Sequence, residues 1–114
     1  CFSPPVFDPS SLTAAYSVTD QIAFSMCHLL ARKEGLLLGA STGAIVAAGL
    51  AVAGKKSKKI LMINPDRGDR YLETVYNHEW LKAQDIKLLE EKALLKASMS
   101  LKPVSRALLL RKSA

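Results

Sequence analysis

Apolar residues follow helical spacing in the segment that begins at residue 20. Within residues 20–33 they fall on one side of a helix, at Ile22, Met26, Leu29 and Leu30. Thr19 is a suitable N-cap, and Gly35 is the residue type that most often ends a helix. The pattern therefore predicts an amphipathic helix over residues 20–33.

Two short apolar runs further along the chain predict buried strands. Residues 36–38 are three leucines, and residues 60–63 read Ile-Leu-Met-Ile. Residues 43–53 between them carry no charge and predict a second helix, which Gly54 ends. Elements that alternate in this way are typical of an α/β fold, with a parallel sheet flanked by helices.

Polar residues lie at the ends of these elements. Ser41 and Thr42 can cap the second helix, and residues 64–69 form a loop after the second strand. The carboxyl ends of parallel strands are where open α/β sheets bind ligands. The turn and the loop are therefore the candidate functional segments.

The hydrophobic pattern becomes helical again from Asn77, with charged residues between the apolar positions. Pro103 is expected to end this helical part, and residues 104–112 to form a last helical piece. We therefore expect residues 1–76 to be a portion of the α/β domain and residues 77–114 to be a helical tail.

The net charge of +6 is concentrated in that tail, since residues 82–112 hold eight Lys or Arg and three acidic residues. A basic tail can bind nucleic acid or an acidic membrane, but no nucleic-acid motif accompanies it, and a solvated helix face explains it more simply. We predict no nucleic-acid partner.

Residues 35–54 are uncharged and long enough to suggest a membrane span. Glycine and serine interrupt the run, however, and a helix that is apolar on all sides also suits a sheet covered on both faces. The sequence therefore favours a protein that does not span the membrane.

Cysteine and histidine do not form a metal site in this sequence. Cys1, Cys27, His28 and His78 lack the paired spacing of zinc ligands. Two unpaired cysteines fit a reducing compartment, and residues 1–18 lack the pattern of a signal peptide. We predict a cytoplasmic location and no metal.

Three stretches together resemble the C-terminal part of a cysteine synthase. They are EGLLLGASTGAIVAA, KKILMIN and PDRGDRYLETVY, and the resemblance covers roughly residues 5–80. Related enzymes of this fold type II group use pyridoxal 5′-phosphate (PLP) and include cystathionine β-synthase. Arg67 stands where many members have Ser, and the PDRGDRYL version is most similar to the siderophore-pathway branch, N-(2-amino-2-carboxyethyl)-L-glutamate synthase.

The resemblance implies PLP-dependent β-replacement on an activated serine, O-phosphoserine or O-acetylserine, by an amino acid or sulfide. It implies a homodimer, and it places Ser41 against the pyridine nitrogen of PLP. A hydroxyl donates to a neutral ring nitrogen, whereas a carboxylate would favour the protonated one. The other residues implied to border the cofactor are Gly39, Thr42, Gly43, Pro65 and Asp66, and those implied to support them from behind are Gly68, Asp69, Arg70 and Tyr71.

The lysine that binds PLP in this family and its glycine-rich phosphate loop have no match in the 114 residues. The resemblance thus supplies no catalytic residue here, and we expect the chain alone to be inactive. Two alternatives stay open: a non-catalytic interaction module that binds a partner through its basic tail, and a small membrane protein. A G-x-S-x-G turn also occurs in hydrolases, but His28 precedes Ser41, the reverse of the order in that fold.

Overall fold

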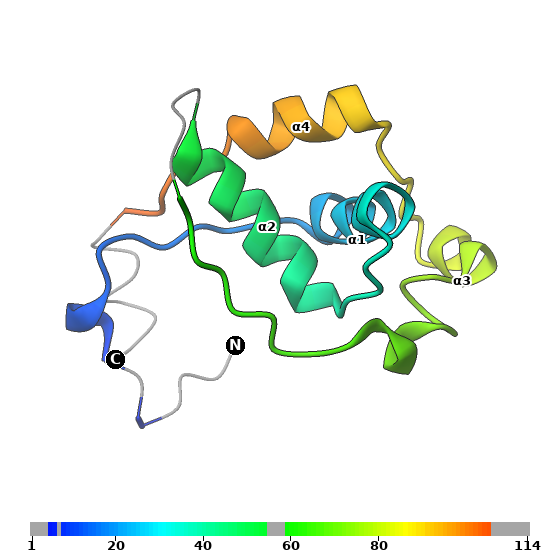
Figure 1. The fold of residues 1–114 in the computed structure, drawn as a ribbon, viewed down its shortest axis with the longest axis horizontal. Helices are drawn as coiled ribbons and strands as arrows, with labels where there is room; N and C mark the ends of the chain where they lie inside the picture. Colours follow the sequence, from blue (N-terminus) through cyan, green and yellow to red (C-terminus); the bar gives the residue numbers. More distant parts are fainter. Residues whose placement is uncertain (1–4, 7, 55–58, 106–114) are drawn as a thin grey trace. The chain divides into compact units, whose positions relative to one another are not determined.

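The computed structural model describes residues 5–6, 8–54 and 59–105, which belong to two compact units. One unit is Val18–Leu101, and the other joins Cys1–Ser17 to Lys102–Ala114. Figure 1 shows the helical elements along the chain. They are the 3-10 helix η1 (Pro9–Ser11), helices α1 (Asp20–Glu34) and α2 (Ala40–Ala53), the 3-10 helix η2 (Gly68–Tyr71), and helices α3 (His78–Ala83) and α4 (Glu91–Met99).

Helix α1 confirms the prediction for residues 20–33 and its two end signals. The Thr19 hydroxyl accepts a hydrogen bond from the Ile22 amide at 3.3 Å. Gly35 adopts a left-handed conformation with φ 66°, which costs a glycine little and ends the helix. Sequence-local chemistry thus sets both ends of this helix.

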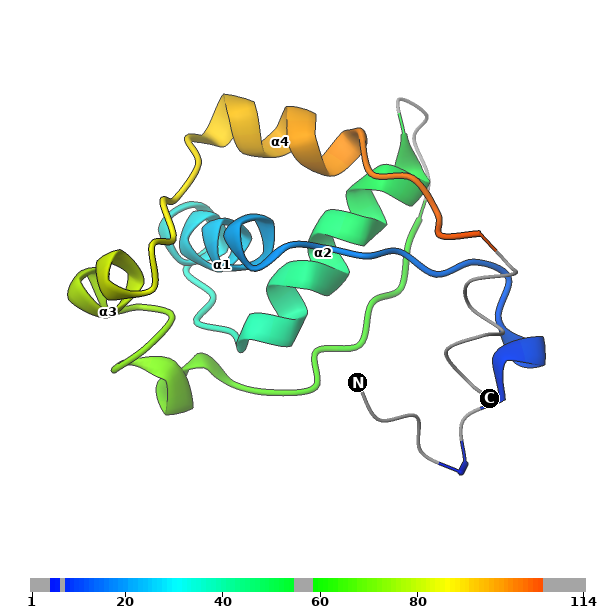
Figure 2. The ribbon, with the colours of Figure 1, turned by 180° about the vertical axis from the view of Figure 1, so that it is seen from behind.

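α1 lies between the other helices of its unit and contributes to two apolar clusters (Figure 2). One cluster contains Ala23, Phe24 and Cys27 of α1 with residues of α3 and the segment before it. The other joins Met26 and Leu29 to α2 and α4. Burial of these aliphatic side chains is the main force that holds the unit together.

Helix α2 matches the prediction for residues 43–53 but begins earlier, at Ala40. Its N-cap is Gly39, which has no side chain to offer, so the expectation that Ser41 or Thr42 caps the helix is wrong. Gly54 ends the helix as expected. Among the described residues, no helix combines the length and the apolar character needed to cross a bilayer.

The strands predicted at residues 36–38 and 60–63 are not formed within the described residues. Leu38 makes a single antiparallel bridge to Arg67, and residues 60–63 run as an open chain beside α2 (Figure 1). A strand exists only where a neighbouring strand completes its ladder of hydrogen bonds. The described part is therefore mostly helical, and the parallel sheet of the expected α/β fold does not appear in it.

The helical pattern after Asn77 divides into two helices. Asp85 has a left-handed φ of 57°, which ends the run that α3 began. Two polar side chains of α1 hold the connection to α4, since Gln21 donates to the Lys87 carbonyl at 2.8 Å and Ser25 accepts from the Leu89 amide at 2.9 Å. Of the last predicted helical piece, residues 104–105 are not helical and residues 106–112 lie outside the described residues.

The smaller unit contains one bridge between distant parts of the chain. Tyr16 pairs with Pro103, and the Val104 amide donates to the Ala15 carbonyl at 2.8 Å. In the larger unit, α3 and α4 pack with α1 and α2. The expected division after residue 76 concerns the whole protein and stays a prediction.

Candidate cofactor-binding turn

The turn before α2 and the loop after Asn64 meet in the structure through a short antiparallel pairing. The Gly39 amide donates to the Asp66 carbonyl at 3.0 Å, and the Gly68 amide donates to the Leu37 carbonyl at 2.9 Å. The bridge between Leu38 and Arg67 lies between these two bonds. The short antiparallel pairing thus brings most of the candidate residues into one place.

Glycine is required at two positions of this pairing because the backbones approach closely. A Cβ atom at Gly39 would lie 3.0 Å from the Asp66 Cβ and 3.2 Å from the Tyr71 ring. A Cβ atom at Gly68 would lie 2.8 Å from the backbone of Leu37. Any larger residue would push the turn and the loop apart.

Two side-chain hydrogen bonds fix the relative position of the turn and the loop. The Thr42 hydroxyl, which is buried, donates to the side-chain oxygen of Asn64. The Tyr71 hydroxyl donates to the Asp66 carboxylate, and this hydrogen bond raises the pKa of Tyr71 above its usual range. Thr42 and Asp66 are therefore already engaged with protein groups.

Ser41 differs from its neighbours because its side chain is exposed in the first turn of α2 and makes no hydrogen bond among the described residues. The helix N-terminus carries a partial positive charge, and no side chain caps it. A hydroxyl at this place can donate to an acceptor atom that approaches the end of the helix.

Gly43 is constrained by packing between helices. A Cβ atom there would lie 2.0 Å from the carbonyl oxygen of Ala23 and 2.8 Å from the sulfur of Cys27, both in α1. Close contact of α1 and α2 therefore explains this glycine without reference to a ligand.

The remaining candidates lie at the surface of the loop. Pro65 is exposed, and Asp69 forms an ion pair with Arg67 at 3.5 Å, with the two side chains 55% and 84% exposed. An ion pair this exposed contributes little to stability. Arg70 is exposed and makes no hydrogen bond or ion pair within the described part, so its guanidinium is available to an anionic group.

Tyr76 and Cys27 hold the turn by hydrogen bonds to its backbone, and no motif in the sequence indicates this role for either residue. The Tyr76 hydroxyl accepts a hydrogen bond from the Leu38 amide at 3.2 Å and donates one to the Leu38 carbonyl. Burial raises the pKa of Tyr76 to about 12. The fully buried Cys27 thiol donates to the Gly39 carbonyl at 3.4 Å, and burial raises its pKa also.

A separate cavity of about 440 Å³ lies around α3 and the segment that follows it, and it shares no residue with the turn or the loop. Its lining residues are His78, Leu81, Lys82, Asp85, Ile86, Lys87 and Leu88. No group of His, Cys, Asp or Glu side chains suited to a metal ion occurs in the described ranges.

Comparison with curated proteins finds relatives of this chain. The chain is 42% identical over 73 residues to an O-acetylserine dependent cystathionine β-synthase of Bacillus subtilis, which supports a relation to the cysteine synthase and cystathionine β-synthase enzymes. The match covers 62% of this chain but only 24% of that protein. No protein-family model and no solved structure matches the chain.

Proposed function

We propose that this chain is the part of a PLP-dependent β-replacement enzyme that binds the pyridine-ring side of the cofactor. The observation that carries the proposal is the 42% identity over 73 residues to an enzyme whose name specifies O-acetylserine. Because that match covers most of a 114-residue chain, it necessarily includes the central residues, among them the loop after Asn64. The substrate is an activated serine, and an amino acid or sulfide replaces its leaving group.

The residues of the turn fit one side of PLP. The exposed Ser41 hydroxyl has no protein partner among the described residues, so it is free to donate to the ring nitrogen. The positive end of α2 disfavours a second positive charge on that nitrogen, which keeps the ring neutral. PLP supplies the electron-accepting ring that stabilises negative charge on the substrate carbon.

The loop residues act on the position of the ring and not on its chemistry. Gly39 and Asp66 are held together by a backbone hydrogen bond of 3.0 Å, and Tyr71 fixes the Asp66 carboxylate. This arrangement would give the cofactor ring a fixed edge to bind against, and Pro65 would border it. Residues 36–43 and 64–71 contain no lysine, so the lysine that binds PLP must come from another part of the protein.

The siderophore-type reaction, which joins O-phosphoserine to glutamate, is the finer proposal. Its support is the PDRGDRYL sequence, in which Arg67 replaces the usual serine, while Arg70 in the same loop is exposed. O-Acetylserine is the competing substrate. We also propose that the natural protein is a homodimer, as the family resemblance implies.

The test is the visible absorbance of the purified natural protein with PLP, before and after each activated serine is added. We expect a bound-PLP band that shifts with one of the two substrates. Ser41→Asp should move the reaction from β-replacement toward transamination, and Ser41→Ala should weaken the band. Ser17→Ala is the control, because Ser17 is also exposed and lies outside the turn.

Two results would contradict the proposal. The first is a natural protein that binds no PLP, which would favour the interaction module with its basic tail. The second is a pair of Ser41 variants that behave like Ser17→Ala in both absorbance and reaction products.

A further inference from the structure

The cavity beside α3 has an apolar floor that continues into the core. Leu81 is 2% exposed, and Ile86 and Leu88 pack partly buried against the same apolar cluster to which Leu81 belongs. The volume of about 440 Å³ lies within the range of small-molecule sites, which is about 300–1,000 Å³. The cavity is therefore large enough for a small molecule with an apolar part.

Charged side chains line the same cavity without an ionic partner in the described part of the chain. Lys82 and Lys87 contribute two positive charges, and Asp85 contributes one negative charge. None of the three forms an ion pair with another described residue. The lining thus keeps an excess of positive charge beside an apolar surface, which is complementary to a molecule that carries an anionic group.

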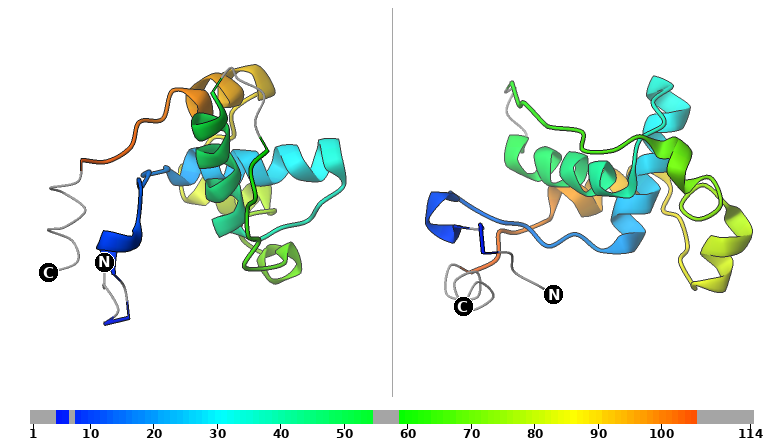
Figure 3. Two further views of the ribbon diagram at one scale, coloured as in Figure 1. Left: turned by 60° about the vertical axis from the view of Figure 1, so that its left-hand side comes forward. Right: turned by 90° about the horizontal axis from the view of Figure 1, so that it is seen from below.

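Hydrogen bonds fix the backbone that forms the wall of this cavity. The Ile86 amide donates to the Leu81 carbonyl at 2.9 Å, and the side chain of Gln21 in α1 donates to the Lys87 carbonyl at 2.8 Å. Figure 3 shows the segment after α3 running beside α1 toward α4. A wall that is already formed binds a ligand without the cost of ordering its backbone.

We propose that this cavity binds a small organic anion, a molecule with an anionic group attached to an apolar body. The apolar body packs on Leu81, Ile86 and Leu88, and the anionic group pairs with the ammonium groups of Lys82 and Lys87. The cavity shares no residue with the turn and the loop that are proposed to bind PLP. The inference therefore goes beyond the proposed function and does not depend on it.

Other occupants fit these observations less well. An apolar segment of further polypeptide would cover Lys82 and Lys87 without offering either a partner, and removing an unpaired charge from water costs free energy. Nucleic acid binds through many phosphate contacts, whereas the lining has one excess positive charge over a concave apolar floor. A small molecule with one anionic group satisfies both the floor and the lysines.

Titration of the natural protein with phenylacetate tests this inference, with the methyl resonances of Ile86 and Leu88 as the readout. Phenylacetamide has the same apolar ring without the charge, and acetate has the charge without the ring. We expect saturable shifts of both methyl resonances with phenylacetate, and an affinity about tenfold or more above that of either control molecule.

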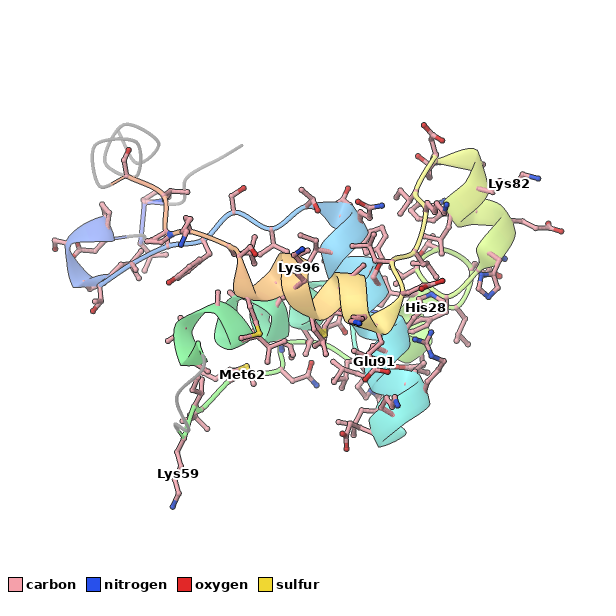
Figure 4. The ribbon with its side chains drawn as sticks, turned by 90° about the horizontal axis from the view of Figure 1, so that it is seen from above. His28, Lys59, Met62, Lys82, Glu91 and Lys96 are labelled. Carbon is pink, nitrogen blue, oxygen red and sulfur yellow. The ribbon has the colours of Figure 1, made fainter. Side chains whose placement is uncertain are left out.

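Charge variants at the cavity give the same test in both directions. Lys82→Gln and Lys87→Gln should each weaken binding of phenylacetate about threefold or more. Asp85→Asn should strengthen it, and Asn tolerates the left-handed backbone at that position, where φ is 57°. Lys96→Gln is the matched control, because Lys96 is an exposed lysine of α4 that does not line the cavity (Figure 4).

Three results would overturn the inference. The first is an absence of shifts at Ile86 and Leu88 with millimolar phenylacetate in the natural protein, which would mean that the cavity is filled or closed there. The second is binding of phenylacetamide or acetate as tight as that of phenylacetate, which would leave only an apolar surface or an adventitious ion. The third is an equal loss of affinity in Lys96→Gln and in the two cavity variants, which would reduce the effect to net charge.

Discussion

Gly43→Ala should destabilise the protein because the added methyl group meets the backbone of a neighbouring helix. The new Cβ would lie 2.0 Å from the carbonyl oxygen of Ala23 and 2.8 Å from the sulfur of Cys27. Gly43 and Ala47 of α2 are buried, so the methyl group cannot turn toward solvent. Helix α1 must therefore move away from α2.

The size of the effect follows from two opposing contributions. Alanine in place of glycine within a helix contributes about 1 kcal/mol of stability. Overpacking a buried contact costs about 1–3 kcal/mol, and the upper value applies here because a helix backbone yields less readily than a side chain. The helices must separate by about 1 Å, which weakens contacts all along their interface. We expect a net loss of about 2 kcal/mol in the free energy of unfolding.

Gly49→Ala is the matched control. It makes the same change in the same helix, but its Cβ meets the sulfur of Met62 at 2.6 Å, and that flexible side chain can move into solvent. The helix-propensity gain cancels between the two variants, so their difference of about 2–3 kcal/mol measures the contact at Gly43 alone.

Urea unfolding of the 114-residue chain provides the assay. The single tryptophan, Trp80, lies with its ring centre 6.2 Å from that of Phe24 and reports on the core through its fluorescence. Gly43→Ala should have the lower midpoint and Gly49→Ala a midpoint equal to or above that of the parent. Equal midpoints for the two variants would refute close packing of α1 and α2 at Gly43.

Three further predictions concern Tyr76 and Cys27, which make hydrogen bonds to the backbone of the turn. Tyr76→Phe should cost about 0.5–1.5 kcal/mol, because the Leu38 backbone loses its partner, and Tyr16→Phe in urea unfolding is the control. The pKa of Tyr76 is raised to about 12, so its contribution to stability is present below the unfolded pKa of about 10 and is lost as the pH rises from about 10 to about 12. The free energy of unfolding of the parent should therefore fall over this range relative to that of Tyr76→Phe, and an unchanged difference between the two would contradict the prediction. The Cys27 thiol is fully buried and has a raised pKa, so it should react with thiol reagents only as fast as the protein opens. A reaction rate equal to that of a free thiol, and unchanged by urea below the unfolding transition, would be inconsistent with the structure.

Local signals in the sequence determined helices α1 and α2. Thr19 and Gly35 act within one or two turns of the chain, and each satisfies or releases backbone groups of its own helix. The same holds for Gly54 at the end of α2. Such signals need no distant partner, which is why they could be recognised from the sequence.

Two motifs in the expected order, the turn before α2 and the loop after Asn64, carried the family resemblance in the sequence. The hydrogen bond between Gly39 and Asp66, which joins these two segments, is a feature of the tertiary structure. What the motifs did not contain is the reason for each glycine. Gly39 and Gly68 are needed for contact between the turn and the loop, and Gly43 for contact between helices.

Tertiary structure alone decided the contact of Tyr76 with Leu38, the pairing of strands and the packing of helices, because these depend on residues far apart in the chain. The Tyr76 hydroxyl accepts a hydrogen bond from the Leu38 amide, 38 positions away in the sequence, and no local pattern predicts such a contact. The apolar run at residues 60–63 has the composition of a strand, but hydrogen bonds from neighbouring strands are what make it one. The sequence specifies which segments are apolar and where helices end, whereas pairing of strands and close approach of helices require the partner to be present.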